Sequence, residues 1–124
     1  MLKSLKIKNY ALIKKVELDF SKGMTVITGE TGAGKSIILG ALGLILGKRA
    51  DSKSLFDKEK KCVVEASFLL KNEYLKSFFK SHELDYEEET IIRRELLPSG
   101  KSRSFINDSP VNLKTLGQLS AFLI

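Results

Sequence analysis

The sequence predicts a protein of the α/β class, in which a sheet carries a phosphate-binding loop between a strand and a helix. Two segments near the N-terminus, 2–7 and 15–20, alternate apolar and polar residues, which is typical of half-buried strands. A short apolar run at 24–28 leads into a glycine-rich loop, and a longer apolar run at 37–46 leads out of it. With 124 residues, of which 43% are hydrophobic, the chain suits one modest domain.

The first part of the chain is predicted to be mainly strand. The segment 2–7 is followed by a connection at 9–13, and the strand at 15–20 ends in a turn at 21–23. The run at 24–28 shows little alternation, as expected of a strand that is covered on both faces. Two antiparallel strands therefore precede the strand that feeds the glycine-rich loop.

A helix is predicted at 35–46, and its apolar residues do not keep to one stripe. We therefore expect neighbouring elements to bury it on nearly all sides. Gly47 follows as a stop, because glycine readily adopts the left-handed conformation that ends helices. A polar loop with six lysines and arginines then spans 48–61, before a strand at 62–70.

The last part of the chain contains helices and a hairpin. Asn72 is predicted to cap a helix at 73–81. The apolar face of that helix is expected to comprise Tyr74, Leu75, Phe78 and Phe79. An acidic loop follows at 83–89. A hairpin of two strands is then predicted at 90–97 and 101–106. A second turn at 107–108 and a final helix at 113–119 complete the chain.

The glycine-rich loop carries the strongest functional signal. It consists of Gly29, Glu30, Thr31, Gly32, Ala33, Gly34, Lys35 and Ser36, and it matches the Walker A pattern G-x-x-x-x-G-K-[ST]. Such a loop directs backbone N–H groups and a helix N-terminus at one point, which makes an anion site. Lys35 is expected to contact the terminal phosphates, Ser36 to bind Mg²⁺, and Ile37 to complete the nucleotide-binding stretch. The predicted ligand is ATP with Mg²⁺; a turn without a ligand would leave Lys35 and Ser36 unexplained.

Composition excludes some classes of protein. The net charge of +6 is scattered along the chain, so it is compatible with nucleic acid but also with nucleotide binding alone. The single cysteine, Cys62, excludes a disulfide within the chain and is expected to be buried, whereas His82 is expected at the surface without a metal. No secretory signal is evident, and the apolar run at 37–46 is shorter than the about 20 residues that span a membrane. A cytoplasmic location is therefore expected.

Several segments together resemble the N-terminal region of the RecN family of bacterial DNA repair proteins, which are ABC-type ATPases of the SMC kind. These segments are 5–13, 28–37, 46–51, 92–94, 100–107, 110–111 and 113–119. Two antiparallel strands ahead of the Walker A strand also match the start of an ABC-type head rather than a small kinase or GTPase. The resemblance covers essentially the whole chain.

The resemblance implies that residues 1–124 form the N-terminal lobe of a split head. A coiled coil and a C-terminal lobe with the signature and Walker B motifs would follow, and two heads would sandwich ATP. The implied partners are the C-terminal lobe, a second head and DNA at double-strand breaks near the nucleoid, with no membrane. The family's Q-loop glutamine would lie beyond Ile124, so Gln118 is expected to face solvent. The lobe alone is expected to self-associate through uncovered sheet or through 119–124.

For Arg49, Tyr10 and the basic hairpin, the sequence leaves more than one role open. Arg49 would lie near the nucleotide or DNA in an SMC-type head, although a solvated loop arginine is the commoner case. Tyr10 would stack on the adenine or pack in the core. The predicted hairpin is basic, and its cations would form a solvated sheet face or contact the DNA backbone. They are Arg93, Arg94, Lys101 and Arg103.

Hydrolytic chemistry is incomplete in the sequence. A Walker B strand would be about four apolar residues ending in a carboxylate, but after the loop the run 68–70 ends in Lys71 and 91–92 ends in Arg93. No catalytic residue is therefore predicted within the chain, although the full-length protein is expected to be an ATPase. Two alternatives remain: a self-contained P-loop phosphotransferase, and a non-catalytic module in which nucleotide controls DNA binding or dimerisation.

Overall fold

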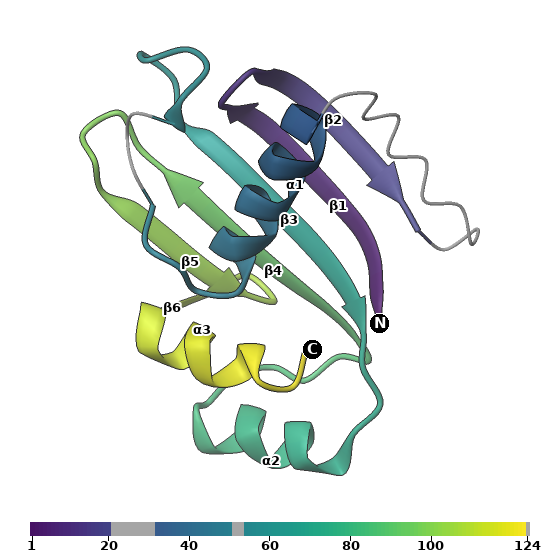
Figure 1. The fold of residues 1–124 in the computed structure, drawn as a ribbon. Coiled ribbons are helices and arrows are strands. Elements are labelled where there is room, and N and C mark those ends of the chain that lie inside the picture. Colours follow the sequence, from purple (N-terminus) through teal and green to yellow (C-terminus); the bar gives the residue numbers. More distant parts are fainter. Residues whose placement is uncertain (21–31, 51–53, 124) are drawn as a thin grey trace.

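The fold is a six-stranded sheet with three helices among the residues that the computed structural model describes, 1–20, 32–50 and 54–123. The strands are β1 (Leu2–Tyr10), β2 (Ile13–Asp19), β3 (Cys62–Leu69), β4 (Glu89–Leu96), β5 (Ser102–Ile106) and β6 (Ser109–Val111). The helices are α1 (Gly32–Ile45), α2 (Glu73–Ser81) and α3 (Leu113–Ser120). The strand order is β2-β1-β3-β4-β5-β6, and every neighbouring pair is antiparallel (Figure 1).

The core lies between the sheet and α1, which crosses one face of the sheet, while α2 and α3 lie together at one end of the strands (Figure 1). Alternate residues of β1, β3 and β4 point toward α1 and are buried, as the alternation at 2–7 predicts. The most deeply buried apolar residues of this layer are Leu5, Ile7, Ala41, Ile45, Val64, Ala66 and Ile92. The other face of β1 carries lysines.

The hairpin between β1 and β2 is tighter than the sequence predicts. Instead of a connection at 9–13, only Ala11 and Leu12 form the turn. Asn9 remains in β1 although its φ is +58°, a conformation that asparagine tolerates better than most residues. Its side chain explains this position, since Nδ2 donates to the carbonyls of Asp57 and Lys60 at 3.0 and 2.9 Å. A side chain of β1 thus holds the loop that precedes β3.

Helix α1 begins at Gly32 rather than at residue 35, so it includes the second half of the Walker A pattern. It ends as predicted, before Gly47, whose φ is +98°. The prediction of nearly complete burial was wrong for one side of the helix. Leu39 is 66% exposed, and Ile38 and Leu42 are only half-buried. The predicted strand at 24–28 lies outside the described residues.

Helix α2 spans 73–81 as predicted, and the Asn72 side chain accepts a hydrogen bond from the Tyr74 backbone N–H at 2.8 Å. Leu75 and Phe79 are buried, and Phe78 is half-buried. The placement of Tyr74 on the apolar face was wrong, because its side chain is 77% exposed. It lies one turn before Phe78, at the solvent edge of the apolar stripe.

The hairpin of β4 and β5 agrees with the prediction to within one residue at each end. The predicted turn at Asn107 and Asp108 is present, and their φ angles are +47° and +66°. The three-residue strand β6 was not predicted, since it is short and contains Pro110. It lies at the sheet edge, where proline is tolerated. Helix α3 starts after Asn112, whose side chain accepts from the Thr115 N–H.

Candidate functional site

The first turn of α1 contains the Gly-Lys-Ser end of the Walker A pattern. The first four N–H groups of an α-helix have no partner within the helix, and the helix dipole adds partial positive charge there. No acidic side chain lies in the first turn of α1. Ser36 is exposed and Ile37 is half-buried, while Gly29, Glu30 and Thr31 lie outside the described residues. This end of α1 therefore suits a phosphate group.

The opposite end of α1 is held by an arginine that the sequence analysis placed on a solvated face. Arg94 of β4 is 2% exposed, because it shares the α1-facing side of the strand with Ile92 and Leu96. Its Nη1 donates to the carbonyls of Leu44 and Lys48 at 2.8 and 2.9 Å. Burial lowers the pKa of this guanidinium, and Arg94 therefore belongs to the core rather than to a basic surface.

The other cations of the hairpin are largely paired. Arg93 Nη1 lies 2.9 Å from the Asp108 carboxylate, and its guanidinium lies over the Phe105 ring at 4.3 Å. Glu95 is 7% exposed, and Lys61, Arg93 and Arg103 surround it at 3.3, 3.5 and 3.5 Å. The predicted solvated basic face therefore holds for Lys101 and for Arg103, which are both exposed, but not for Arg94.

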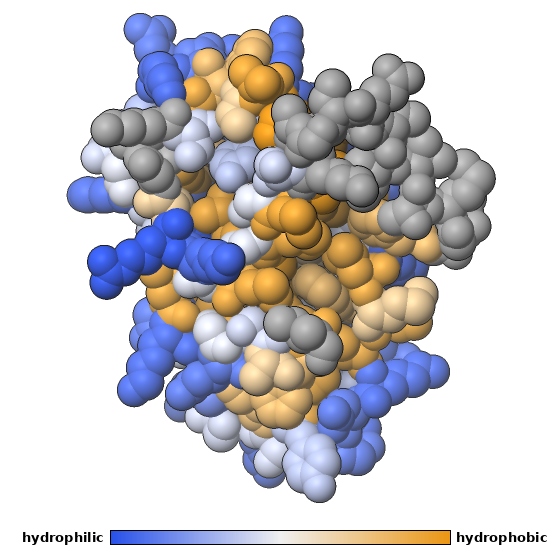
Figure 2. Space-filling view, in the orientation of Figure 1, coloured by the Kyte–Doolittle hydropathy of each residue, from blue (hydrophilic) through white to orange (hydrophobic). Residues whose placement is uncertain are grey.

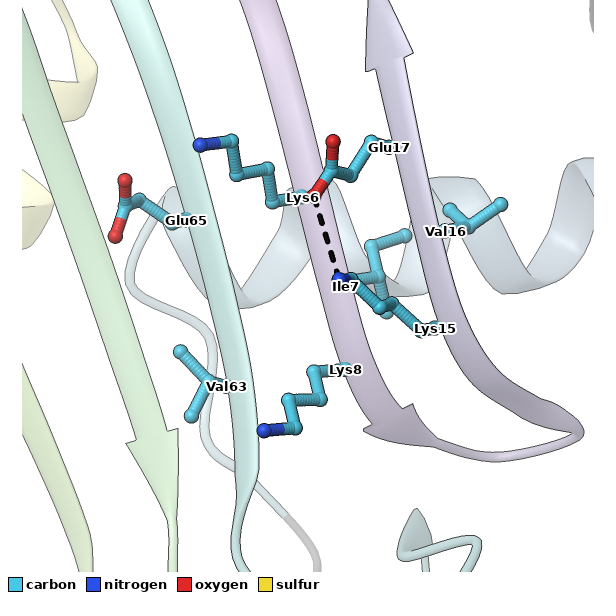
Figure 3. A pocket seen from close by; sticks show the side chains of 8 residues that line it. All are labelled: Lys6, Ile7, Lys8, Lys15, Val16, Glu17, Val63 and Glu65. Carbon is cyan, nitrogen blue, oxygen red and sulfur yellow. Dashed lines mark ion pairs between the residues drawn. The ribbon is translucent and has the colours of Figure 1, made fainter.

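A shallow hollow of about 270 Å³ lies over β1, β2 and β3 (Figure 3). Its lining residues are Lys6, Ile7, Lys8, Lys15, Val16, Glu17, Val63 and Glu65. Lys6 and Lys8 alternate with the buried Leu5 and Ile7, so they point away from α1. In the sheet register Lys6 lies opposite Glu17 on one side and Glu65 on the other. The hollow is thus a surface of mixed charge, with three lysines and two glutamates, on the sheet face that points away from α1.

Remaining sequence predictions concern single residues. Cys62 is buried as predicted, and this burial raises the pKa of its thiol to about 11. His82 is exposed as predicted and stacks on Phe78, with 4.2 Å between the ring centroids. Gln118 faces solvent on α3, also as predicted. In the described part of the chain, no three His, Cys, Asp or Glu side chains gather as a metal site, and no helix is long and apolar enough to span a bilayer.

A family model for the AAA domain matches residues 4–122. The chain belongs to this family. As an AAA domain it is also similar to curated bacterial proteins named DNA repair protein RecN. The protein from Vibrio cholerae is 50% identical over 123 residues, covering 96% of this chain and 22% of the relative. The protein from Bacillus subtilis is 37% identical over 126 residues, covering 100% of this chain and 22% of the relative. The AAA domain described here thus spans about a fifth of the length of these relatives, and the predicted RecN resemblance is confirmed.

Solved structures share the fold of this AAA domain. A Smc head domain with a coiled coil and joint from Pyrococcus yayanosii matches with a TM-score of 0.75 and 26% identity, covering 99% of this chain and 25% of that chain. A chain from a study of ATP-driven dimerization and DNA-stimulated activation of SMC ATPases matches with a TM-score of 0.74 and 27% identity, covering 99% and 80%. The predicted fold class is therefore confirmed, and a self-contained phosphotransferase is not favoured.

Arg49 and Tyr10, the two further residues for which a contact with the nucleotide or DNA is predicted, lie beside α1. Arg49 is exposed just beyond the Gly47 turn. Tyr10 packs its ring against the middle of α1, where a Cβ placed at Gly40 would lie 2.5 Å from the tyrosine hydroxyl oxygen. Burial, with Cys62 nearby, raises the pKa of Tyr10. A packing role for Tyr10 is thus visible, and its stacking on adenine, like the role of Arg49, stays a prediction.

Replacing Gly40 with alanine should destabilise the AAA domain by up to about 2 kcal/mol, because the overlap of the added methyl with the Tyr10 hydroxyl outweighs the about 1 kcal/mol that alanine gains over glycine within a helix. Tyr10→Phe should restore most of that loss in the double variant, since the next ring atom lies 3.5 Å from the added Cβ. Urea unfolding of the four proteins in this double-mutant cycle measures the coupling. Additive effects would contradict the Tyr10–Gly40 contact.

Proposed function

We propose that residues 1–124 are the ATP-binding N-terminal lobe of an ABC-type ATPase head, and that the full-length protein acts in DNA double-strand break repair and recombination. The observation that carries the proposal is the Gly-Lys-Ser end of a Walker A pattern in the first turn of α1. The RecN names of the relatives and the SMC-type fold support it.

In this proposal each part of the loop has a chemical role. The backbone N–H groups from Gly32 onward, together with Gly29, Glu30 and Thr31, bind phosphate oxygens. Lys35 places an ammonium on the terminal phosphates, and the Ser36 hydroxyl is a ligand for Mg²⁺. The ion, when bound, neutralises phosphate charge. Ile37 follows the loop in α1 and completes the nucleotide-binding stretch; its side chain is half-buried.

Nucleotide titration tests the proposal directly. Wild-type protein should bind ATP with Mg²⁺, and Lys35→Ala should weaken binding by about 10-fold or more, because a charge-assisted contact is lost. Lys8→Ala is a matched control, since Lys8 is an exposed lysine on the sheet face remote from α1. Isothermal calorimetry measures all three affinities. Equal affinity of wild type and Lys35→Ala would refute the role of Lys35.

The wider biological role rests on the comparisons. The RecN relatives are named as bacterial DNA repair proteins, and one structural neighbour comes from work on ATP-driven dimerization and DNA-stimulated activation of SMC ATPases. We extend these properties to the full-length protein: a C-terminal lobe completes the head, a second head closes over ATP, and DNA is the macromolecular partner. A cytoplasmic, nucleoid-associated location follows from that role.

The isolated chain should self-associate. The side of α1 that carries Leu39 presents apolar surface to solvent, which Figure 2 shows over the middle of the molecule. The segment 119–124 contributes less than the sequence predicts, because Leu119 is fully buried and only Phe122 is a large exposed apolar side chain among 119–123. Apolar patches of this kind favour association. Sedimentation should detect dimers or larger species that Leu39→Glu weakens; a clean monomer at high concentration would contradict this.

A further inference from the structure

Arg94 contacts the backbone at the C-terminal end of α1. One guanidinium nitrogen, Nη1, donates to both the Leu44 and the Lys48 carbonyl, and Nη2 lies 3.4 Å from the Ser102 hydroxyl. Leu44 lies in the last turn of α1, and its carbonyl also accepts from the Gly47 N–H at 3.2 Å. Lys48 lies beyond the Gly47 turn. Arg94 therefore bridges the helix and its exit loop to β4 and β5.

Stability alone is a poor reason for an arginine at this position. None of the ion pairs among the described residues includes Arg94, and its Nε is buried without a hydrogen-bond partner. Burial of a charge without a carboxylate partner is costly, and the negative end of the α1 dipole offsets only part of that cost. An apolar side chain of similar length would fill the same space without it. What the arginine adds is geometry, because a planar fork with several donors can hold two carbonyls at fixed positions.

Fixing the C-terminal end of α1 also affects the position of its N-terminal, phosphate-binding end. Helix α1 has 14 residues. At about 1.5 Å per residue its length is about 21 Å, and a helix transmits its own rotation and axial position along that length. The exit turn is itself fixed: Gly47 lies against Gly117 of α3, and the Lys48 N–H donates to the Gly43 carbonyl at 3.0 Å. Holding this end, together with the packing of the middle of α1, therefore helps to fix where the first turn, with Gly32 to Ser36, lies over the sheet.

We propose that Arg94 is a positioning residue, which holds the C-terminal end of α1 so that the phosphate-binding end is correctly placed. The inference rests on the proposed nucleotide binding and adds to it a residue that does not touch the ligand. The bond to the Lys48 carbonyl also fixes the backbone next to Arg49.

The test compares nucleotide affinity with stability in the full-length protein. Arg94→Met should weaken binding of ATP with Mg²⁺ at least fivefold at a temperature where circular dichroism shows it fully folded, and Arg94→Lys should lie between Arg94→Met and wild type. Arg93→Met is the matched control, because Arg93 precedes Arg94 on β4 but points to the other face. Leu75→Ala, in the core next to α2, supplies a comparable loss of stability at a distance from α1. Both controls should bind within twofold of wild type.

The outcomes distinguish failure of the positioning role of Arg94 from failure of the proposed nucleotide binding. Wild-type affinity in Arg94→Met, or an equal loss in Leu75→Ala, would overturn the positioning role. If Arg94→Met does not fold, Arg94→Lys decides on the same criterion. If the wild type binds no nucleotide, the proposed function fails, and hydrogen exchange then decides on Arg94: amides of 32–36 should exchange faster in Arg94→Lys than in Leu75→Ala. Equal exchange there would overturn the role of Arg94 as well.

Discussion

Residues 1–124 alone should hydrolyse ATP at least about 1,000-fold more slowly than the full-length protein, because groups that act together in catalysis lose several orders of magnitude when separated. Phosphoryl transfer requires a positioned water and stabilisation of the charge on the γ-phosphoryl oxygens. The Walker A loop supplies part of that stabilisation. No run of about four apolar residues after the loop ends in a carboxylate, since the run at 62–64 that precedes Glu65 has only three. A Walker B strand, which would supply the acidic residues of the metal shell, is therefore not recognisable within 1–124.

Steady-state phosphate release measures this prediction. Lys35→Ala serves as the control for contaminating ATPases, since it leaves any contaminant unchanged. Adding the C-terminal lobe, in the same chain or as a separate protein, should restore turnover, and DNA should raise it further. Robust turnover by residues 1–124 that disappears in Lys35→Ala would contradict the prediction. It would show that a catalytic carboxylate lies within the chain and would revive the phosphotransferase alternative.

Much of the fold could be predicted because local patterns determine it. Alternation assigns the inward face of β1, and asparagine side chains that accept backbone N–H bonds mark the start of α2. The turn after β5 uses Asn107 and Asp108, which tolerate positive φ. The tight β1–β2 turn was missed because its stability depends on Asn9 contacting a loop about 50 residues later. Such a contact leaves no local pattern.

In the candidate site, too, one part could be predicted from a local pattern and another part could not. The Walker A pattern is local, and it predicts the anion-binding end of α1 directly. Arg94 was assigned to a basic surface because of its charge, although strand alternation places it with the buried Ile92 and Leu96. Alternation was the available signal. What the sequence does not contain is the reason that the charge can be buried, namely two backbone carbonyls at the end of α1.

The removal of one aromatic ring from α2 should have the largest effect on stability. Phe79→Ala should lower the free energy of unfolding by about 3–5 kcal/mol, because the ring is fully buried and its cavity would not collapse completely. The ring packs edge-on against Tyr86 at 5.5 Å and lies 6.1 Å from Phe78. Domains of this size have only about 5–15 kcal/mol in total, so the variant should be marginal.

The same helix provides a control of similar size. Tyr74→Ala removes an aromatic ring that is 77% exposed, so it should change stability by less than about 0.5 kcal/mol. Helix α2 has nine residues, too few to be stable by itself, and its stability therefore depends on the side chains that it buries. Denaturant unfolding of both variants compares these two faces directly. Comparable losses in Phe79→Ala and Tyr74→Ala would mean that α2 packs through a different face, and the corrected assignment of Tyr74 to the solvent side would then fail.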